Sequence, residues 1–279
     1  MRRGSGKDWR LTTRRIRCVV EYLGTRYAGF QRQPGEMTVQ QVLEEAIGAV
    51  TQEDVRTTGS GRTDAGAHAL GQVFTFSSAT QLPAEALRRA VNARLPYDIS
   101  LRHADEAPES FHPRHSARSR TYRYLIWNRP ARSPFWSDRA THIPVPLDHA
   151  LMHEACQLLV GNHDFSSFVP LHQDTNRTRT IIRASCFRDG DLVSIELEGN
   201  SFMRQMIRSI AGTLIRVGLK KVSIGEFAEI LESKTRTEAG DTAPAQGLYL
   251  VSVQYSGSSE QANIDVESGS WAAAIEETV

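Results

Sequence analysis

The sequence predicts an α+β protein built from two similar halves. Residues 16–108 read in the order β-α-β-β-α-β, because apolar runs of strand type surround two segments of helical periodicity. Residues 109–256 nearly repeat that order, with one more helix. The chain of 279 residues is 40% hydrophobic, enough to bury a large core, and it contains no apolar run of the ~18 residues that a membrane helix needs.

The first half begins with a strand over residues 16–22. Thr38 and Gln41 have the spacing of a capping box, and apolar residues recur on one face of a predicted helix over 39–50. The remaining elements of this half are a short strand near Val55, a strand over 73–76, a helix opened by Pro83 and a strand around 99–101.

The second half begins with a strand over residues 118–127. After it we expect a helix over 147–160 closed by Gly161, a hairpin of 181–187 and 192–197 around Asp189-Gly190, a long helix over 202–217 ended by Gly218, a helix that starts at the capping box of Ser223 and Glu226, and a last strand over 247–253.

This order of elements is ferredoxin-like in each half. We expect two antiparallel sheets that join edge to edge, with helices on one face and a cleft between the halves wide enough for a folded RNA. A basic extension, 1–15, precedes the N-terminal domain, and an acidic tail of weak patterning, 257–279, follows the C-terminal one. We expect the tail to be mostly disordered.

Charge is concentrated in parts of the chain. The net charge of +1 combines +6 over 1–17 and −5 over 257–279, so residues 18–256 sum to zero and nucleic acid would need a local patch. Residues 111–133 supply six arginines, two histidines and no acid, interleaved with Tyr122, Tyr124 and Trp127. This combination favours phosphate contacts with stacking surfaces, although a solvated strand face with a few core aromatics has the same composition.

The three cysteines, Cys18, Cys156 and Cys186, are widely spaced among apolar residues, which indicates buried thiols and neither a disulfide framework nor a zinc site. The basic start of the chain lacks the apolar core of a signal peptide, so we expect a cytoplasmic protein.

Residues 59–68, Gly-Ser-Gly-Arg-Thr-Asp-Ala-Gly-Ala-His, have the composition of an active-site loop. Three glycines allow positive φ and a close approach to a ligand, while Asp64 is offered outward beside a predicted strand. A turn whose polar residues bond their own backbone is the plain alternative. Metal binding by Asp64 and His68 needs a helix that the glycines disfavour, and no Gly-Lys-Ser/Thr completes a phosphate-binding loop.

The sequence Gly-Arg-Thr-Asp-Ala-Gly over 61–66, followed by His-Ala, resembles the signature of the tRNA pseudouridine synthase A family. The resemblance extends over about residues 16 to 255, and other stretches agree with it: 119–124, Ser-Arg-Thr-Tyr-Arg-Tyr; 199–208, Gly-Asn-Ser-Phe-Met-Arg-Gln-Met-Ile-Arg; 111–114; 161–168; and 247–250. It implies an isomerase that needs no cofactor and no metal, with Asp64 as the nucleophile.

The other family motifs imply partners for Asp64. Arg208 is the arginine expected to pair with it, because burial disfavours the ionised form of a carboxyl group unless a cation lies nearby. Tyr122 is expected to stack on a flipped uracil and is a candidate to remove the C5 proton. Tyr124, two residues on and on the same strand face, is the competitor for that role.

The resemblance also implies contacts with the substrate. Arg62 is expected to fill the gap left by the flipped base, Leu248 to line the uracil pocket, and Arg204 to contact RNA phosphates. Arg114 and His68, which lie in matching stretches, are further candidates for substrate binding.

The implied function is conversion of uridine to pseudouridine at positions 38, 39 and 40 of the tRNA anticodon stem-loop, by a homodimer. The sequence departs from the family pattern at Leu23, Ala67, Ser201 and Gln205, which bears on the choice of uridine and removes no catalytic group. The alternatives are a non-catalytic RNA-binding or RNA-chaperone protein on the same scaffold, and a pseudouridine synthase for a different RNA.

Overall fold

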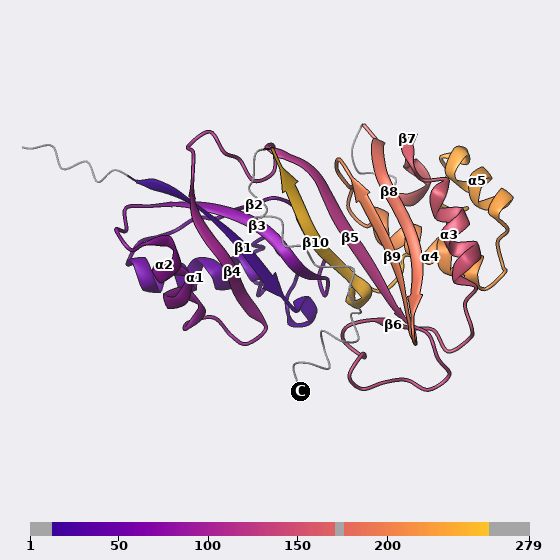
Figure 1. The fold of residues 1–279 in the computed structure, drawn as a ribbon, viewed down its shortest axis with the longest axis horizontal. Helices are drawn as coiled ribbons and strands as arrows, with labels where there is room; N and C mark the ends of the chain where they lie inside the picture. The colour runs from indigo at the N-terminus through magenta and orange to yellow at the C-terminus, as the bar shows by residue number, and fades with distance from the viewer. Residues whose placement is uncertain (1–12, 171–175, 257–279) are drawn as a thin grey trace, which may run out of the picture.

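The computed structural model describes residues 13–170 and 176–256, which form an open mixed sheet covered by helices (Figure 1). The predicted acidic tail lies outside the described residues, as do residues 1–12 of the basic extension. The rest of that extension belongs to the fold, because the first strand begins at Arg14 and not at residue 16.

The sheet has ten strands in the order β4-β1-β3-β10-β5-β9-β8-β7, with β2 paired to β3 and β6 to β5. The strands are β1 (Arg14–Tyr22), β2 (Thr58–Gly59), β3 (His68–Ser78), β4 (Ile99–Ala107), β5 (Ala117–Trp127), β6 (Thr141–His142), β7 (Gly161–Asp164), β8 (Thr178–Asp189), β9 (Leu192–Gly199) and β10 (Leu248–Tyr255).

Strand β10, from the end of the described chain, lies at the centre of the sheet and joins its two halves (Figure 1). It is antiparallel to β5 and parallel to β3, where Tyr249 pairs with His68 and Leu250 with Ala69. The junction with β3 is therefore short, and everything on the β3 side of it comes from the first half of the chain.

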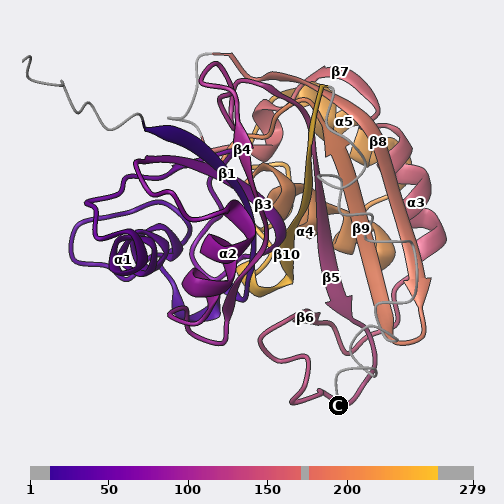
Figure 2. The same cartoon turned by 60° about the vertical axis from the view of Figure 1, so that its left-hand side comes forward.

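Five helices lie on one face of this sheet (Figures 1 and 2). They are α1 (Val39–Thr51) and α2 (Ala84–Asn92) in the first half, and α3 (His149–Gln157), α4 (Met206–Gly218) and α5 (Ile224–Ser233) in the second. Within the described residues, no helix is long and apolar enough to cross a membrane.

Strand alternation decides which side chains meet the helices. Tyr122 and Tyr124 of β5 belong to the main core, whereas Leu125, the next residue, belongs to a smaller cluster on the opposite face. The main core continues across the β3–β10 junction, since Leu250 and Ala69 are both members of it. All three cysteines are buried free thiols.

Two helix ends differ from the sequence prediction. The capping box at Ser223 and Glu226 forms in full, but Thr38 only accepts from the Gln41 backbone, and the Gln41 side chain bonds Glu45 instead. The helix predicted over 147–160 is observed as the shorter α3, which ends at Gln157. Gly161, predicted to close that helix, instead begins β7.

The predicted helix over 202–217 is wrong at its start. Helix α4 begins only at Met206, after Gln205 in the left-handed region at φ 62°. The preceding residues instead form a loop, in which the Phe202 ring packs edge-on against Tyr122 at 5.2 Å between ring centroids. A tertiary aromatic contact thus replaces the first helical turn.

Candidate active site

The loop that carries Asp64 connects β2 to β3 and is held by hydrogen bonds at its start and in its middle. The Ser60 hydroxyl donates to the Gln72 side-chain oxygen at 2.5 Å, and the Gln72 amide donates to the Gly61 carbonyl at 3.0 Å. Further along, the Thr63 hydroxyl lies 2.8 Å from that of Tyr22. The loop is thereby fixed to β3 and β1 of the N-terminal half.

A second loop, residues 23–38 between β1 and α1, packs closely on the Asp64 loop because two of its residues are glycines. Gly29 has φ +93°, and a Cβ there would lie 2.6 Å from the Thr63 carbonyl oxygen. A Cβ at Gly24 would lie 1.8 Å from the Ala67 carbonyl oxygen. Any side chain at either position would force the Asp64 loop to move.

Arg208 of α4 brings the second half to this loop. Its Nη1 donates to Asp64 Oδ2 at 2.9 Å, and its Nε donates to the Ala243 carbonyl at 2.7 Å. Both side chains of the pair are 16% exposed, so solvent screens the interaction only in part. Arg208 lies in the first turn of α4, where the helix dipole also favours a nearby anion.

Tyr122 lies beside this pair on the helix face of β5. Burial raises the pKa of Tyr122 to about 12; the Arg120 charge opposes this increase and the Asp64 charge adds to it. Within the described residues, its hydroxyl makes no hydrogen bond, although its ring is held by Phe202. Tyr122 is therefore a neutral phenol at ordinary pH, with a hydroxyl available to a ligand.

Tyr124, the competing tyrosine, is engaged in the core. It is fully buried, and its hydroxyl lies 2.8 Å from the Pro244 carbonyl, to which it donates. Its hydroxyl also contacts that of Thr141. Of the two tyrosines, only Tyr122 borders the cavity described next.

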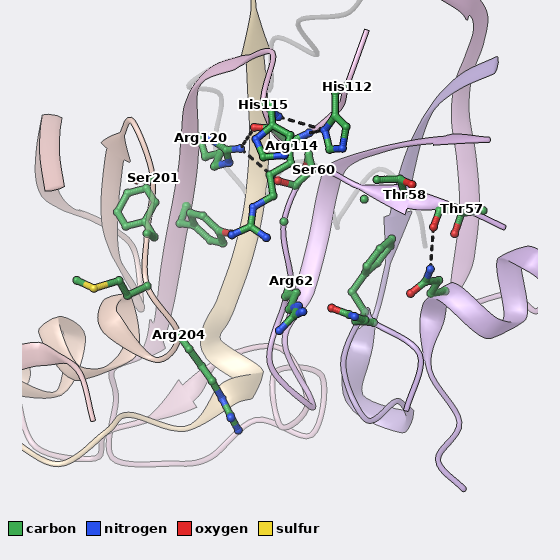
Figure 3. A pocket seen from close by; sticks show the side chains of 18 residues that line it. Thr57, Thr58, Ser60, Arg62, His112, Arg114, His115, Arg120, Ser201 and Arg204 are labelled. Carbon is green, nitrogen blue, oxygen red and sulfur yellow. Dashed lines mark hydrogen bonds between the residues drawn. The ribbon is translucent and has the colours of Figure 1, made fainter. Parts of the chain in front are cut away.

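A cavity of about 710 Å³ opens between the two halves (Figure 3). Tyr122 and Arg120 contribute to it from the sheet, and Phe202 lies on the side of the C-terminal half. In the view of Figure 3, Arg114 and Arg120 lie toward the upper end and Arg204 toward the lower end. The lining residues are Phe30, Gln31, Gln40, Thr57, Thr58, Gly59, Ser60, Gly61, Arg62, His112, Arg114, His115, Arg120, Tyr122, Ser201, Phe202, Met203 and Arg204.

The cavity is strongly basic. Its lining residues include four arginines and two histidines and no aspartate or glutamate. Burial is the main influence that lowers the pKa of His112, and His115 and Arg15 lower it further. A polyanion would find a complementary electrostatic surface here.

The predicted site residues divide into three groups. Arg62, Arg114 and Arg204 line the cavity with Tyr122. Asp64 and Arg208 do not line it themselves, but Asp64 follows Arg62 closely in the loop, and a Cβ at Gly61 of that loop would lie 3.8 Å from the Tyr122 hydroxyl.

Leu248 and His68 form the third group, buried away from the lining. Leu248 is paired with Tyr124 at the start of β10. His68 is fully buried, and its ring lies 4.6 Å from that of Tyr249. Neither is among the residues that line the cavity.

His68 uses both ring nitrogens within the fold. Nδ1 accepts from the Gly24 backbone N–H at 2.9 Å, and Nε2 donates to the Gln246 carbonyl at 3.0 Å. Burial lowers its pKa, against the influence of that carbonyl. Its hydrogen bonds fix the neutral tautomer and leave no lone pair for a metal. The described residues contain no group of three or more His, Cys, Asp or Glu placed to hold a metal ion.

Sequence reasoning missed three features of this site. Phe202 seemed to belong to a helix face, the Ser60–Gln72 pair carried no recognisable spacing, and Arg120 was one of six arginines in a basic stretch. Only the alternation of β5 separates Arg120, on the cavity side, from Arg123, which pairs with Glu196 at 2.7 Å on the other face.

Comparison with known proteins identifies the family of this chain. The family model described as tRNA pseudouridine synthase matches residues 18–116 and 155–256. The tRNA pseudouridine synthase A of Pseudoalteromonas atlantica is 46% identical over 242 residues, which cover 86% of this chain and 92% of that protein. The protein of the same name from Thermoanaerobacter sp. is 44% identical over 87% of this chain and its own full length. The chain belongs to the tRNA pseudouridine synthase family.

Proposed function

We propose that this protein converts uridine to pseudouridine at positions 38, 39 and 40 of the tRNA anticodon stem-loop. The observation that carries the proposal is the ion pair of Asp64 and Arg208 beside Tyr122, at a basic cavity between the halves. The names of the relatives agree with this activity on tRNA.

The reaction breaks the bond between the sugar C1′ and uracil N1, and it joins C1′ to C5 of the same base. Asp64 is the nucleophile and attacks either C1′ or C6, forming a covalent intermediate that divides the exchange into easier steps. The C5 proton leaves and N1 gains one, so nothing is added overall. Arg208 pairs with the Asp64 carboxylate and holds it in place until it attacks.

Tyr122 receives the uracil once the base has left its helix. Its ring supplies a stacking surface, and its unpaired hydroxyl is the candidate to exchange the C5 proton. As a neutral phenol it must pass on its own proton when it accepts one. Arg62, on the same loop as Asp64, fills the space that the base vacates.

The RNA backbone lies along the cavity. Arg204 and Arg114 contact phosphates at opposite ends of it, which accounts for a lining with no carboxylate. Leu248 supports the uracil pocket from the core through its pairing with Tyr124. His68 accepts a hydrogen bond from Gly24 and so holds the end of the Asp64 loop in place. Its contribution to substrate binding is therefore indirect, through the position of that loop.

Each half is a ferredoxin-like unit, 16–108 and 109–256, and the active protein is a cytoplasmic homodimer. The strand orders β4-β1-β3-β2 and β10-β5-β9-β8 support the first part, because both read 4-1-3-2 when the four strands are numbered in chain order; β6, β7 and α5 are additions in the second half. The dimer rests on the family resemblance alone.

The test uses purified full-length protein and unmodified tRNA transcripts, without added metal or cofactor. Pseudouridine is mapped by nucleotide for the wild type, for Asp64→Asn, and for Asp54→Asn as a control whose side chain is 83% exposed. We expect modification at positions 38 to 40 by the wild type and the control, and none by Asp64→Asn, with tRNA binding retained by all three.

Three other results would each change the proposal. Substantial isomerisation by Asp64→Asn removes Asp64 from the role of nucleophile. Modification at other nucleotides, or of another RNA alone, moves the target. Binding of tRNA by the wild type with no isomerisation favours a non-catalytic RNA-binding protein.

A further inference from the structure

Arg120 of β5 is a buried cation that ties three separate segments together. It is only 8% exposed, and its guanidinium donates three hydrogen bonds to backbone carbonyls. Nη1 bonds Asn200 at 2.8 Å, and Nη2 bonds Arg114 at 2.8 Å and Ser60 at 3.2 Å. Each acceptor belongs to a different loop, and all three loops contribute to the cavity wall.

The three carbonyls take the place of a counter-ion. Among the described residues, Arg120 makes no ion pair with a carboxylate, whereas Arg123 on the same strand pairs with Glu196 at 2.7 Å. Burial lowers the pKa of Arg120, which reflects the cost of holding this charge away from water. A hydrophobic side chain would avoid that cost, so packing alone does not explain the arginine.

The segments held by Arg120 are those that build the proposed catalytic centre. Ser60 begins the loop that presents Asp64, and its side chain is locked to Gln72. Asn200 begins the loop in which Phe202 packs against Tyr122. Arg120 is two residues from Tyr122 on the same strand face, so one side chain connects the supports of both groups.

We propose that Arg120 is a positioning residue that sets the Asp64 loop and the Phe202 loop relative to Tyr122, and that it does so through its three backbone hydrogen bonds and not through contact with RNA phosphate. This inference rests on the proposed function for its kinetic consequence. Its structural content, the joining of three loops, is independent of the substrate.

The first measurement follows backbone hydrogen exchange in wild type, Arg120→Gln, Arg120→Lys and Arg123→Gln. Arg123 is a matched control because it lies on the same strand, is 5% exposed, and faces the other side of the sheet. Its partner Glu196 also keeps Arg183 at 3.2 Å, so the control leaves no unpaired charge. We expect faster exchange in 60–64, 112–116 and 200–205 for Arg120→Gln, by about tenfold or more, and none of this change for the control.

The second measurement separates kcat from KM for tRNA. A displacement of about 1 Å between reacting groups can cost about 100-fold in rate, so we expect Arg120→Gln to lose about 100-fold in kcat while KM changes less than about threefold. The ammonium of Arg120→Lys still reaches some of the three carbonyls, so this variant should have a kcat about tenfold higher than that of Arg120→Gln. Arg123→Gln should keep kcat within about threefold of wild type.

The outcomes are distinct. Unchanged loop exchange in Arg120→Gln overturns the proposal, as does a loss confined to KM with a weaker salt dependence of binding, which would identify a phosphate contact. Should Arg120→Gln not fold, Arg120→Lys carries both measurements. If the wild type does not isomerise tRNA, the proposed function fails, and the exchange experiment still decides whether Arg120 joins the loops.

Discussion

The Asp64 carboxylate and the Arg208 guanidinium, 144 positions apart in the chain, meet at 2.9 Å across the two halves of the fold. The loop between β2 and β3 carries the anion, and the first turn of α4 carries the cation. A second bond, from Arg208 Nε to the Ala243 carbonyl, fixes the direction of the guanidinium. Neither half alone contains both charges of this pair.

Replacement of Arg208 by lysine should reduce the catalytic rate, and replacement by glutamine should reduce it further. A lysine cannot bond Asp64 and Ala243 with the same planar group, so Arg208→Lys should lose on the order of 100-fold in kcat, and Arg208→Gln more. Single-turnover rates at saturating tRNA measure the effect. Arg216→Lys on the same helix is the control and should keep the wild-type rate; a wild-type rate in Arg208→Lys would show that the pair is dispensable.

The two tyrosines of β5 should respond differently to loss of their hydroxyls. Tyr122→Phe keeps the ring that packs on Phe202, so tRNA affinity should stay within about threefold while kcat falls by about 100-fold or more. Tyr124→Phe removes a buried hydrogen bond and should lower the free energy of unfolding by about 1 kcal/mol with little change in kcat. Equal kcat values for wild type and Tyr122→Phe would leave Tyr122 a stacking role only.

Arginines of the cavity should contribute to the salt dependence of tRNA binding. Loss of one phosphate contact lowers the slope of log K against log salt concentration by about one, so Arg204→Gln and Arg114→Gln should each show this change. Arg89→Gln, on the exposed side of α2, should leave the slope as it is. Fluorescence titrations between low and physiological salt provide the slopes, and an equal effect of all three variants would argue against a localised site.

Acid should destabilise the fold partly through His68. Burial lowers the pKa of His68 in the folded protein, so the unfolded chain takes up a proton first as the pH falls through about 6.5. The contribution of neutral His68 to the free energy of unfolding is thus complete above that pH. It decreases toward lower pH, by at most about 1.4 kcal/mol per pH unit. Urea unfolding at pH 7.5 and 5.5 should give a smaller pH dependence for His68→Gln than for wild type. The same dependence in both would assign the effect to other groups.

Gly24 should tolerate no side chain. A Cβ at this position would meet the Ala67 carbonyl oxygen at 1.8 Å, so Gly24→Ala must displace backbone next to the Asp64 loop and should cost about 3 kcal/mol or more. On the surface of α5, Gly225→Ala meets only the Ser223 hydroxyl at 4.0 Å and should stabilise the helix by up to about 1 kcal/mol. Thermal unfolding and kcat of the two variants compare them directly.

Local patterns were sufficient to predict most elements of the fold. The apolar periodicity of α1 and the turn at Asp189-Gly190 lie where the sequence predicts them, because each depends on residues close in the chain. The start of α4 could not be predicted in this way. Its position depends on Phe202 packing against Tyr122, a contact between residues 80 positions apart that no local preference encodes.

The candidate site depends still more on distant contacts. Family motifs drew attention to Asp64, Tyr122 and Arg208, although nothing in their spacing predicts that the fold brings them together. The basic stretch over 111–133 also proved to be divided, since β5 turns Arg120 and Arg123 to opposite faces and into internal bonds. Composition alone does not distinguish an arginine that meets RNA from one that supports the backbone.

Among the described residues, strand β10 is the last strand to be synthesised, yet it occupies the middle of the sheet. A chain that ends before Leu248 lacks the strand that pairs with both β3 and β5, so the two halves lose their backbone connection and keep only side-chain contacts such as the Arg120–Ser60 bond. Truncation within this strand should therefore abolish the whole site and not weaken it by degrees. Assembly of the catalytic site thus waits for a strand that is made after the other described strands of the sheet.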